Sequence, residues 1–191
     1  ADSIKVLCRF RPQNSREKKA NAFIVVRVSD DHTLCDVTHP DKSKQPKPVA
    51  FNFDCVFDWT STQTEVFEHA ASHLVEQIFD GFNATIFAYG QTGAGKTYSM
   101  EGKLGSPHRG IVPRTVESIF ESIADADEKM EYLLQVSYVE IYLEALRDLL
   151  KPGNNAMKIR DSKTGVYIEN VTEMYVRDAQ EVMDLMQMGS K

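Results

Sequence analysis

The clearest helical pattern in the chain lies between residues 62 and 81. Thr62 and Glu65 have the spacing of a capping box, which marks a helix start. Gly81 is suited to a C-terminal cap because it adopts a left-handed backbone without strain. The apolar positions recur every three or four residues, as on one face of a helix: Val66, Phe67, Ala70, Ala71, Leu74, Val75, Ile78 and Phe79.

Several shorter apolar stretches predict strands. Residues 4–10 predict a first strand that stops at Arg11-Pro12, because proline cannot donate to a sheet ladder. Residues 84–89 are apolar and β-prone enough for a strand buried on both faces of a parallel sheet. Three more stretches, separated by charged and proline-containing turns, predict a small antiparallel lobe at the edge of the main sheet: residues 23–28, 33–37 and 49–53.

The second half of the chain begins with a loop and a helix. Residues 102–113 are rich in glycine and proline and predict the loop. The helix has a buried stripe: Val116, Ile119, Phe120 and Ile123. Residues 132–142 are the longest β-prone stretch and predict one central strand. A short helical piece is expected over residues 144–150.

The last residues predict a hairpin and a helix. Residues 157–160 and 166–169 flank Thr164-Gly165, a sequence suited to a tight turn. Asp178 is expected to cap the final helix, together with Glu181. The order of helix, strand, glycine-rich loop and helix in the first half is typical of an α/β fold.

Composition agrees with a globular protein of one domain and excludes several classes. The chain has 191 residues, of which 42% are hydrophobic and 26% charged. A net charge of −6 argues against a general nucleic-acid or anionic-membrane binder, and no apolar run suggests membrane insertion. The three cysteines fit no metal spacing, and His69 and His73 lack a third ligand. With no visible secretory signal, we expect a cytoplasmic protein.

Residues 90–97 read GQTGAGKT, a complete G-x-x-x-x-G-K-[ST] phosphate-loop motif. Its glycines let backbone N–H groups turn toward phosphate oxygens. Lys96 is expected to reach the β and γ phosphates, and the Thr97 hydroxyl to ligate Mg²⁺. A glycine-rich turn with a solvated lysine is the alternative, which the flanking strand and helix disfavour. The loop predicts these nucleotide contacts: Gly90, Gln91, Thr92, Gly93, Ala94, Gly95, Lys96 and Thr97.

Four segments resemble the motor domain of a kinesin, and the likeness runs along all 191 residues. They read IKVLCRFRP at residues 4–12, IFAYGQTGAGKTYSMEG at 86–102, HRGIVPR at 108–114 and VSYVEIYLEALRDLL at 136–150. Within the family, the chain looks most like conventional kinesin heavy chain. The resemblance implies a phosphate-loop NTPase with a mixed central β-sheet flanked by helices. It also implies binding of ATP, ADP and Mg²⁺, and hydrolysis coupled to microtubules.

The resemblance also implies where the base of the nucleotide binds. Arg9, Arg11 and Pro12 match the family's adenine-contacting strand end. Tyr98 stands where many relatives have histidine against the base, and its ring can still stack there. From the residues alone, Arg9 could instead pair with an acid on a neighbouring strand. The family resemblance favours the nucleotide contact.

Two family motifs do not occur in the sequence: the Asn-x-x-Ser-Ser-Arg-Ser-His and Asp-x-x-Gly switches. We therefore expect the chain to be a partial motor domain, covering a little more than half, without the main microtubule-binding helices and neck linker. Hydrolysis needs groups that position the attacking water, so this chain is expected to bind nucleotide and hydrolyse it poorly. Its partners would be the missing half of the motor, microtubules and, through a coiled-coil stalk outside these residues, a second copy.

Track contacts on this half would fall on residues 142–144 and 158–163, where basic side chains suit an acidic microtubule surface. An ordinary solvated hairpin explains these residues equally well. Two other functions remain open besides a motor. One is another phosphate-loop enzyme such as a small-molecule kinase, and the other is a nucleotide-regulated microtubule-binding protein that does not move.

Overall fold

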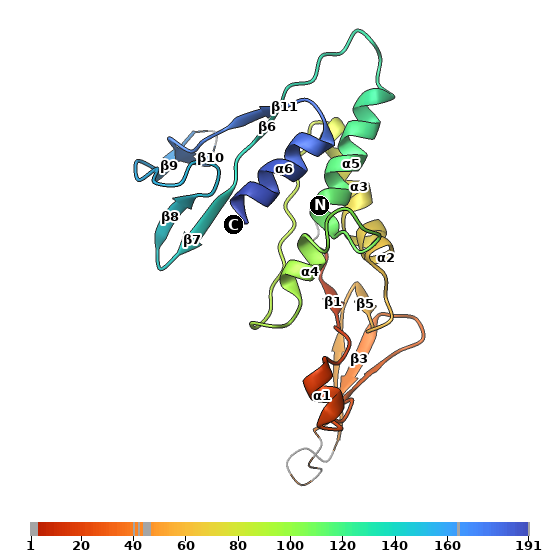
Figure 1. Ribbon diagram of the computed structural model, residues 1–191. Helices are drawn as coiled ribbons and strands as arrows, with labels where there is room; N and C mark the ends of the chain where they lie inside the picture. Colours follow the sequence, from red (N-terminus) through yellow and green to blue (C-terminus); the bar gives the residue numbers. More distant parts are fainter. Residues whose placement is uncertain (1–3, 40, 42, 44–46, 164, 191) are drawn as a thin grey trace. The chain divides into compact units, whose positions relative to one another are not determined.

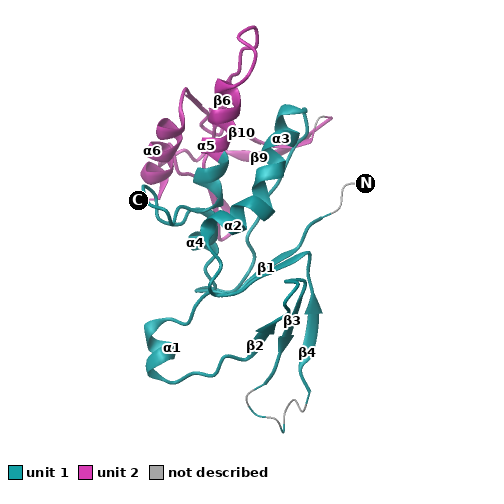
Figure 2. Ribbon diagram, turned by 90° about the vertical axis from the view of Figure 1, so that its right-hand side faces the viewer, with its two compact units in different colours: residues 1–115 teal, residues 116–191 magenta. Residues whose placement is uncertain are grey.

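The computed structural model describes residues 4–39, 41, 43, 47–163 and 165–190. The chain divides into two compact units, Ala1–Thr115 and Val116–Lys191 (Figure 2). The length and composition predict one domain, whereas each unit has its own set of small sheets. Thr164, in the predicted hairpin turn, lies outside the described residues.

Unit 1 contains the only parallel strand pair among the residues that the structure describes. Strand β1 (Leu7–Arg9) pairs with β5 (Cys55–Phe57), so the two strands end side by side (Figure 1). The predicted small antiparallel lobe is confirmed, with strand order β2-β3-β4. Its strands are β2 (Val26–Val28), β3 (Leu34–Val37) and β4 (Val49–Asn52).

The predicted helix after residue 62 is confirmed in three consecutive parts. They are α2 (Gln63–Phe67), a π-helical turn η1 (Glu68–Ser72) and α3 (His73–Phe79). Thr62 and Glu65 form the expected capping box. At the other end, the Gly81 and Phe82 N–H groups donate to the Ile78 and Gln77 carbonyls, which is the Schellman pattern. The buried face packs in one core cluster: Phe57, Val66, Phe67, Ala71 and Ile111.

Three further helices begin before residue 125 in the described part of the chain. Helix α1 (Ser15–Lys19) has a capping box of Asn14 and Glu17, and α4 (Lys96–Met100) follows the phosphate loop directly. Helix α5 (Ile111–Ala124) begins before Pro113, so the predicted loop is shorter than residues 102–113. Proline is tolerated in a first helical turn because the N–H it lacks has no partner within the helix there.

The predicted strand over residues 84–89 is not formed. Ile86 packs against the core cluster, but Phe87 and Tyr89 are 76% and 95% exposed. A buried strand needs hydrogen-bonding partners along its edges. Within the described residues no strand pairs with this segment, so it stays extended without a ladder.

Two predictions for unit 2 are wrong. Residues 132–142 form two short strands, β6 (Leu134–Val136) and β7 (Val139–Tyr142), rather than one central strand. Residues 144–150 are not helical, because β8 (Ala145–Asp148) pairs with β7 as an antiparallel hairpin. Alanine, leucine and arginine are good helix formers, but tertiary context routinely overrides helix propensity, and here pairing with the β-prone VEIY segment outweighs it.

The C-terminal predictions are confirmed. Strands β9 (Lys158–Ser162) and β10 (Gly165–Glu169) form the predicted hairpin. Strand β11 (Met174–Val176), which was not predicted, pairs antiparallel with β6. Helix α6 (Ala179–Gly189) begins with the Asp178 carboxylate accepting from the Glu181 N–H at 2.8 Å. Its buried side chains are Val182 and Met186.

One buried carboxylate organises the turns of unit 2. Asp148 is 4% exposed and accepts hydrogen bonds from the N–H groups of Leu150, Lys151 and Thr172 and from the Asn154 amide. Burial opposes ionisation, but the bonds from Asn154 and Thr172 outweigh it and lower the pKa of Asp148. The carboxylate thus joins the end of β8 to the segment before β11.

Candidate nucleotide-binding site

Glycines with a left-handed backbone conformation shape the phosphate loop. Gly93 has φ +81° and Gly95, the residue before α4, has φ +101°, a region that residues with a Cβ rarely adopt. The Ala94 N–H donates to the Gln91 carbonyl at 3.1 Å, which closes a turn inside the loop. Helix α4 has five residues, so its dipole is small and the loop N–H groups are the main neutral donors toward an anion.

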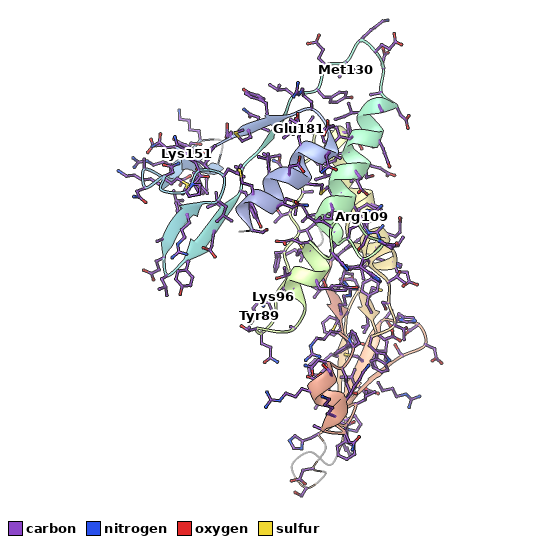
Figure 3. All side chains as sticks on the ribbon, in the orientation of Figure 1. Tyr89, Lys96, Arg109, Met130, Lys151 and Glu181 are labelled. Atoms are coloured by element: carbon purple, nitrogen blue, oxygen red, sulfur yellow. The ribbon has the colours of Figure 1, made fainter. Side chains whose placement is uncertain are left out.

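Lys96 lies folded over the loop that precedes it. Its Nζ atom donates to the carbonyls of Gly90 at 2.8 Å and Gln91 at 3.0 Å. Figure 3 labels Lys96 and Tyr89, which mark the two ends of the loop. The ammonium group is therefore held where a phosphate on the loop N–H groups would meet it.

Thr97 and Thr92 both have exposed side chains. Thr97 is in the first turn of α4, beside Lys96. Among the described residues no group of three acidic, histidine or cysteine side chains could hold a metal ion. Phosphate-bound Mg²⁺ keeps several waters and needs only one or two protein ligands, so an exposed hydroxyl at this position fits it.

Arg9 leaves the end of β1 and joins three elements. Its Nη1 atom donates to Gln63 Oε1 at 2.8 Å and to Ser99 Oγ at 2.9 Å. Its guanidinium carbon lies 5.3 Å from the centroid of the Tyr98 ring, a cation–π contact. Burial lowers the pKa of Arg9, and the phenol of Tyr98 partly offsets this effect. The side-chain partners of Arg9 are thus a glutamine and a serine, and not an acid on a neighbouring strand.

Gln63 is a site residue that the sequence analysis missed. It is only 3% exposed, and its Nε2 atom donates to the carbonyls of Tyr98 at 2.7 Å and His108 at 3.0 Å. It therefore connects the start of α2 to Arg9, α4 and the loop after α4. A polar residue directly after a capping threonine is usually exposed, so nothing in the local pattern distinguished it.

Arg11 ties the phosphate loop to α1. Its Nε atom donates to the Gly93 carbonyl at 2.9 Å. Its two terminal nitrogens donate to the Glu17 carboxylate at 2.7 and 2.6 Å, a bidentate pair. The hydrogen bond from Arg11, with a further one from the Asn14 N–H, lowers the pKa of Glu17 to about 2.

A pocket of about 370 Å³ lies between these elements in unit 1. Seven predicted site residues line it: Arg9, Arg11, Pro12, Gly93, Ala94, Gly95 and Tyr98. The other predicted residues belong to the adjoining loop and helix start and do not line it: Gly90, Gln91, Thr92, Lys96 and Thr97. The pocket also has walls that were not predicted, including Asp58, Trp59 and Ser61. The strand end and the phosphate loop therefore border one cavity, with apolar and basic walls suited to a flat base.

Residues 9–191 match the family model described as the kinesin motor domain. The chain belongs to the kinesin motor domain family. It is 43% identical over 192 residues to a kinesin heavy chain of Neurospora crassa and 39% identical over 193 residues to kinesin-related protein 3 of Dictyostelium discoideum. The chain covers 99% and 98% of its own length in these matches, but only 20% and 16% of the two relatives.

A solved structure described as a fast kinesin superposes with a TM-score of 0.90 at 40% identity. The match covers 98% of this chain and 52% of that one, so the chain spans about half of the solved structure. The α/β kinesin fold inferred from the sequence is thereby confirmed for these residues. Within the described part of the chain, no helix combines the length and hydropathy needed to cross a membrane.

Proposed function

We propose that this chain is the nucleotide-binding part of an ATP-driven microtubule motor. The observation that carries the proposal is the contact between Arg11 and Gly93, which joins the base-side strand end to the phosphate loop beside one pocket. A nucleoside triphosphate needs both regions at once, one for its base and one for its phosphates. A kinase for a small substrate would use the loop but has no need of the CRFRP strand end.

Each predicted residue then has a defined task. Arg9, Pro12 and Tyr98 form the base wall, and the loop from Gly90 to Gly95 turns its N–H groups toward the phosphates. Lys96 exchanges its loop carbonyls for the β and γ phosphates. Mg²⁺, when bound by the Thr97 hydroxyl and the phosphates, would neutralise phosphate charge.

Binding and hydrolysis are expected to separate in this chain. Phosphoryl transfer depends on groups that place the attacking water and stabilise the charge of the transition state. The switch motifs that carry those groups in the family do not occur in these residues. We infer that residues 1–191 bind ATP and ADP but turn ATP over slowly, and that the rest of a motor domain restores hydrolysis.

Microtubule contacts would come from two hairpin turns. Lys158 begins β9 and Lys163 follows it in the turn toward β10, whereas Arg160 is paired with Glu169 at 3.0 Å. In the β7–β8 hairpin, Arg147 is paired with Glu140 and lies 4.5 Å from the Tyr142 ring centroid. The lysines are thus the better candidates for an acidic track. The assembled motor would be a cytoplasmic, microtubule-associated homodimer joined by a stalk outside these residues.

The test is steady-state ATP hydrolysis with and without microtubules. Residues 1–191 are compared with a form extended through both switch motifs, each with Lys96→Ala and, as a control, Lys103→Ala, because Lys103 is an exposed lysine outside the loop, after α4. We expect activity in the extended form alone, stimulation by microtubules, and a loss of about 100-fold or more for Lys96→Ala only. ATP hydrolysis by the extended form that ignores microtubules would favour another phosphate-loop enzyme. Microtubule binding without turnover would favour a regulated, non-motile binder.

A further inference from the structure

The pocket has one wall that the family resemblance does not explain. Asp58 and Trp59 follow β5, whereas Arg9, Arg11 and Pro12 end and follow β1. The two strands are parallel neighbours, and the Phe10 N–H donates to the Phe57 carbonyl at 2.8 Å. Ligands of α/β proteins bind beyond the carboxyl ends of parallel strands, so the turn after β5 borders the same ligand as the strand end after β1.

This turn is held rigidly by its own hydrogen bonds. Asp58 Oδ1 accepts from the Thr60 N–H at 2.7 Å and from the Thr60 hydroxyl at 2.6 Å. The Ser61 N–H donates to the Asp58 carbonyl at 3.3 Å, and the capping box at Thr62 begins directly afterwards. Among the described residues, both hydrogen bonds to this carboxylate reach Oδ1. Asp58 lines the pocket, and its Oδ2 keeps acceptor capacity for a ligand there.

Trp59 supplies a flat apolar surface in the same wall. It is the single tryptophan of the chain and is 38% exposed, although an indole is costly to leave in water. Phe10 and Tyr98 also line the pocket, and the Arg9 guanidinium lies over the Tyr98 ring. Trp59 therefore offers a further aromatic surface for the base, beside the wall of Arg9, Pro12 and Tyr98.

We propose that Trp59 packs on the base of the bound nucleotide and that Asp58 Oδ2 accepts a hydrogen bond from its 6-amino group. The pocket then favours adenine over a purine that lacks the 6-amino group, because Oδ2 would lose that donor. This inference rests on the proposed nucleotide binding and adds base selection to it.

The first test is the affinity for ADP and for purine riboside 5′-diphosphate, which has hydrogen in place of the 6-amino group. Calorimetry on the extended form, with the wild type preferring ADP by about tenfold, would support the proposal. Asp58→Asn keeps an oxygen for the Thr60 N–H but places an amide donor in the pocket, so the preference should disappear. Thr60→Val is the matched control, since it removes a hydrogen bond to Oδ1 and should leave the preference unchanged.

The second test uses the tryptophan as its own reporter. ADP should change the fluorescence of residues 1–191 in a saturable way, and Trp59→Phe should abolish that change while nearly preserving affinity. Trp59→Ala should weaken ADP binding about fivefold or more, the range for loss of one stacked base. In the extended form, the fluorescence change of Trp59→Phe is subtracted from that of the wild type, so that the signals of any further tryptophans cancel.

The outcomes separate this inference from the proposed function. If the wild type binds ADP but Trp59→Ala binds it equally well and Asp58→Asn keeps the preference for ADP, base selection by this turn is wrong and nucleotide binding stands. If neither ADP nor ATP binds to the extended wild type, the proposed function fails, and this inference fails with it.

Discussion

At the scale of single residues, the Arg11–Glu17 pair links the phosphate loop to α1. The pair should make the stability of the folded state depend on pH. The hydrogen bond from Arg11 holds the pKa of Glu17 at about 2, below its ordinary value of 4.5. A depressed pKa of a carboxyl group means that ionised Glu17 favours the folded state. The pair therefore contributes its full stabilisation of the folded state above pH 4.5, and this stabilisation is lost as the pH falls toward 2.

An NMR titration of the side-chain carboxyl carbons measures this directly. We expect a midpoint near 2 for Glu17, and Arg11→Ala should return it toward the ordinary range. Glu65 serves as an internal control, because hydrogen bonds from Thr62 lower its pKa and Arg11 takes no part in them. An unchanged Glu17 midpoint in Arg11→Ala would show that the pair does not form.

At the scale of elements, the start of α2 carries both the core helix and the buried Gln63. Thr62→Ala removes the side-chain acceptor for the Glu65 N–H and should lower the free energy of unfolding by about 1 kcal/mol. Thr64→Ala, an exposed position in the same turn, should have little effect. Urea unfolding followed by circular dichroism gives both values, and equal losses would argue against a specific role for the cap.

One substitution distinguishes a hairpin from a helix over residues 144–150, because it changes the free energy of unfolding in opposite directions in the two structures. Leu143 and Glu144 have φ of +48° and +64°, which strains residues with a Cβ. In the hairpin, Glu144→Gly should raise the free energy of unfolding by about 0.5–1 kcal/mol. In a helix the same change would lower it by about 1 kcal/mol.

Ala145→Gly is the control for this hairpin, since residue 145 has an ordinary strand backbone and glycine should lower stability there in either case. Thermal unfolding of the wild type, Glu144→Gly and Ala145→Gly, measured side by side, gives the comparison. A destabilising Glu144→Gly would mean that the segment is helical after all.

At the scale of the whole molecule, each unit leaves large apolar side chains in water. Phe87 and Tyr89 are exposed in unit 1, and Leu133, Ile141 and Val166 in unit 2. The chain spans 52% of the solved structure that it matches, and unpaired strand segments of this kind gain partners from further strands. We expect residues 1–191 to bind the dye ANS and to self-associate, and the extended form to do neither.

Light scattering and analytical ultracentrifugation at several concentrations test this expectation. The extended form is the control, because it contains the same residues with the remaining strands available. A monomeric chain of residues 1–191 that unfolds in one sharp transition and hydrolyses ATP at the full rate would contradict the view of these residues as a partial motor domain.

The sequence by itself determined the features whose causes are local. The capping box at Thr62, the N-cap at Asp178, the Schellman end at Gly81, the β9–β10 hairpin and the phosphate loop each depend on residues a few positions apart. Backbone preferences and side-chain reach act over that distance, so a pattern of residue types is enough to predict them. The phosphate loop, with the segments at residues 4–12, 108–114 and 136–150, also carried the resemblance to the kinesin family.

Only the tertiary structure decided which segments pair and which side chains share a cavity. Whether residues 84–89 form a strand, or residues 145–148 a helix, depends on hydrogen-bonding partners far away in the chain. Gln63, Asp58 and Trp59 likewise join Arg9 and Tyr98 only because β1 and β5 run in parallel and end together. Such contacts follow from long-range packing, which outweighs local propensity and leaves no signature in the sequence around each residue.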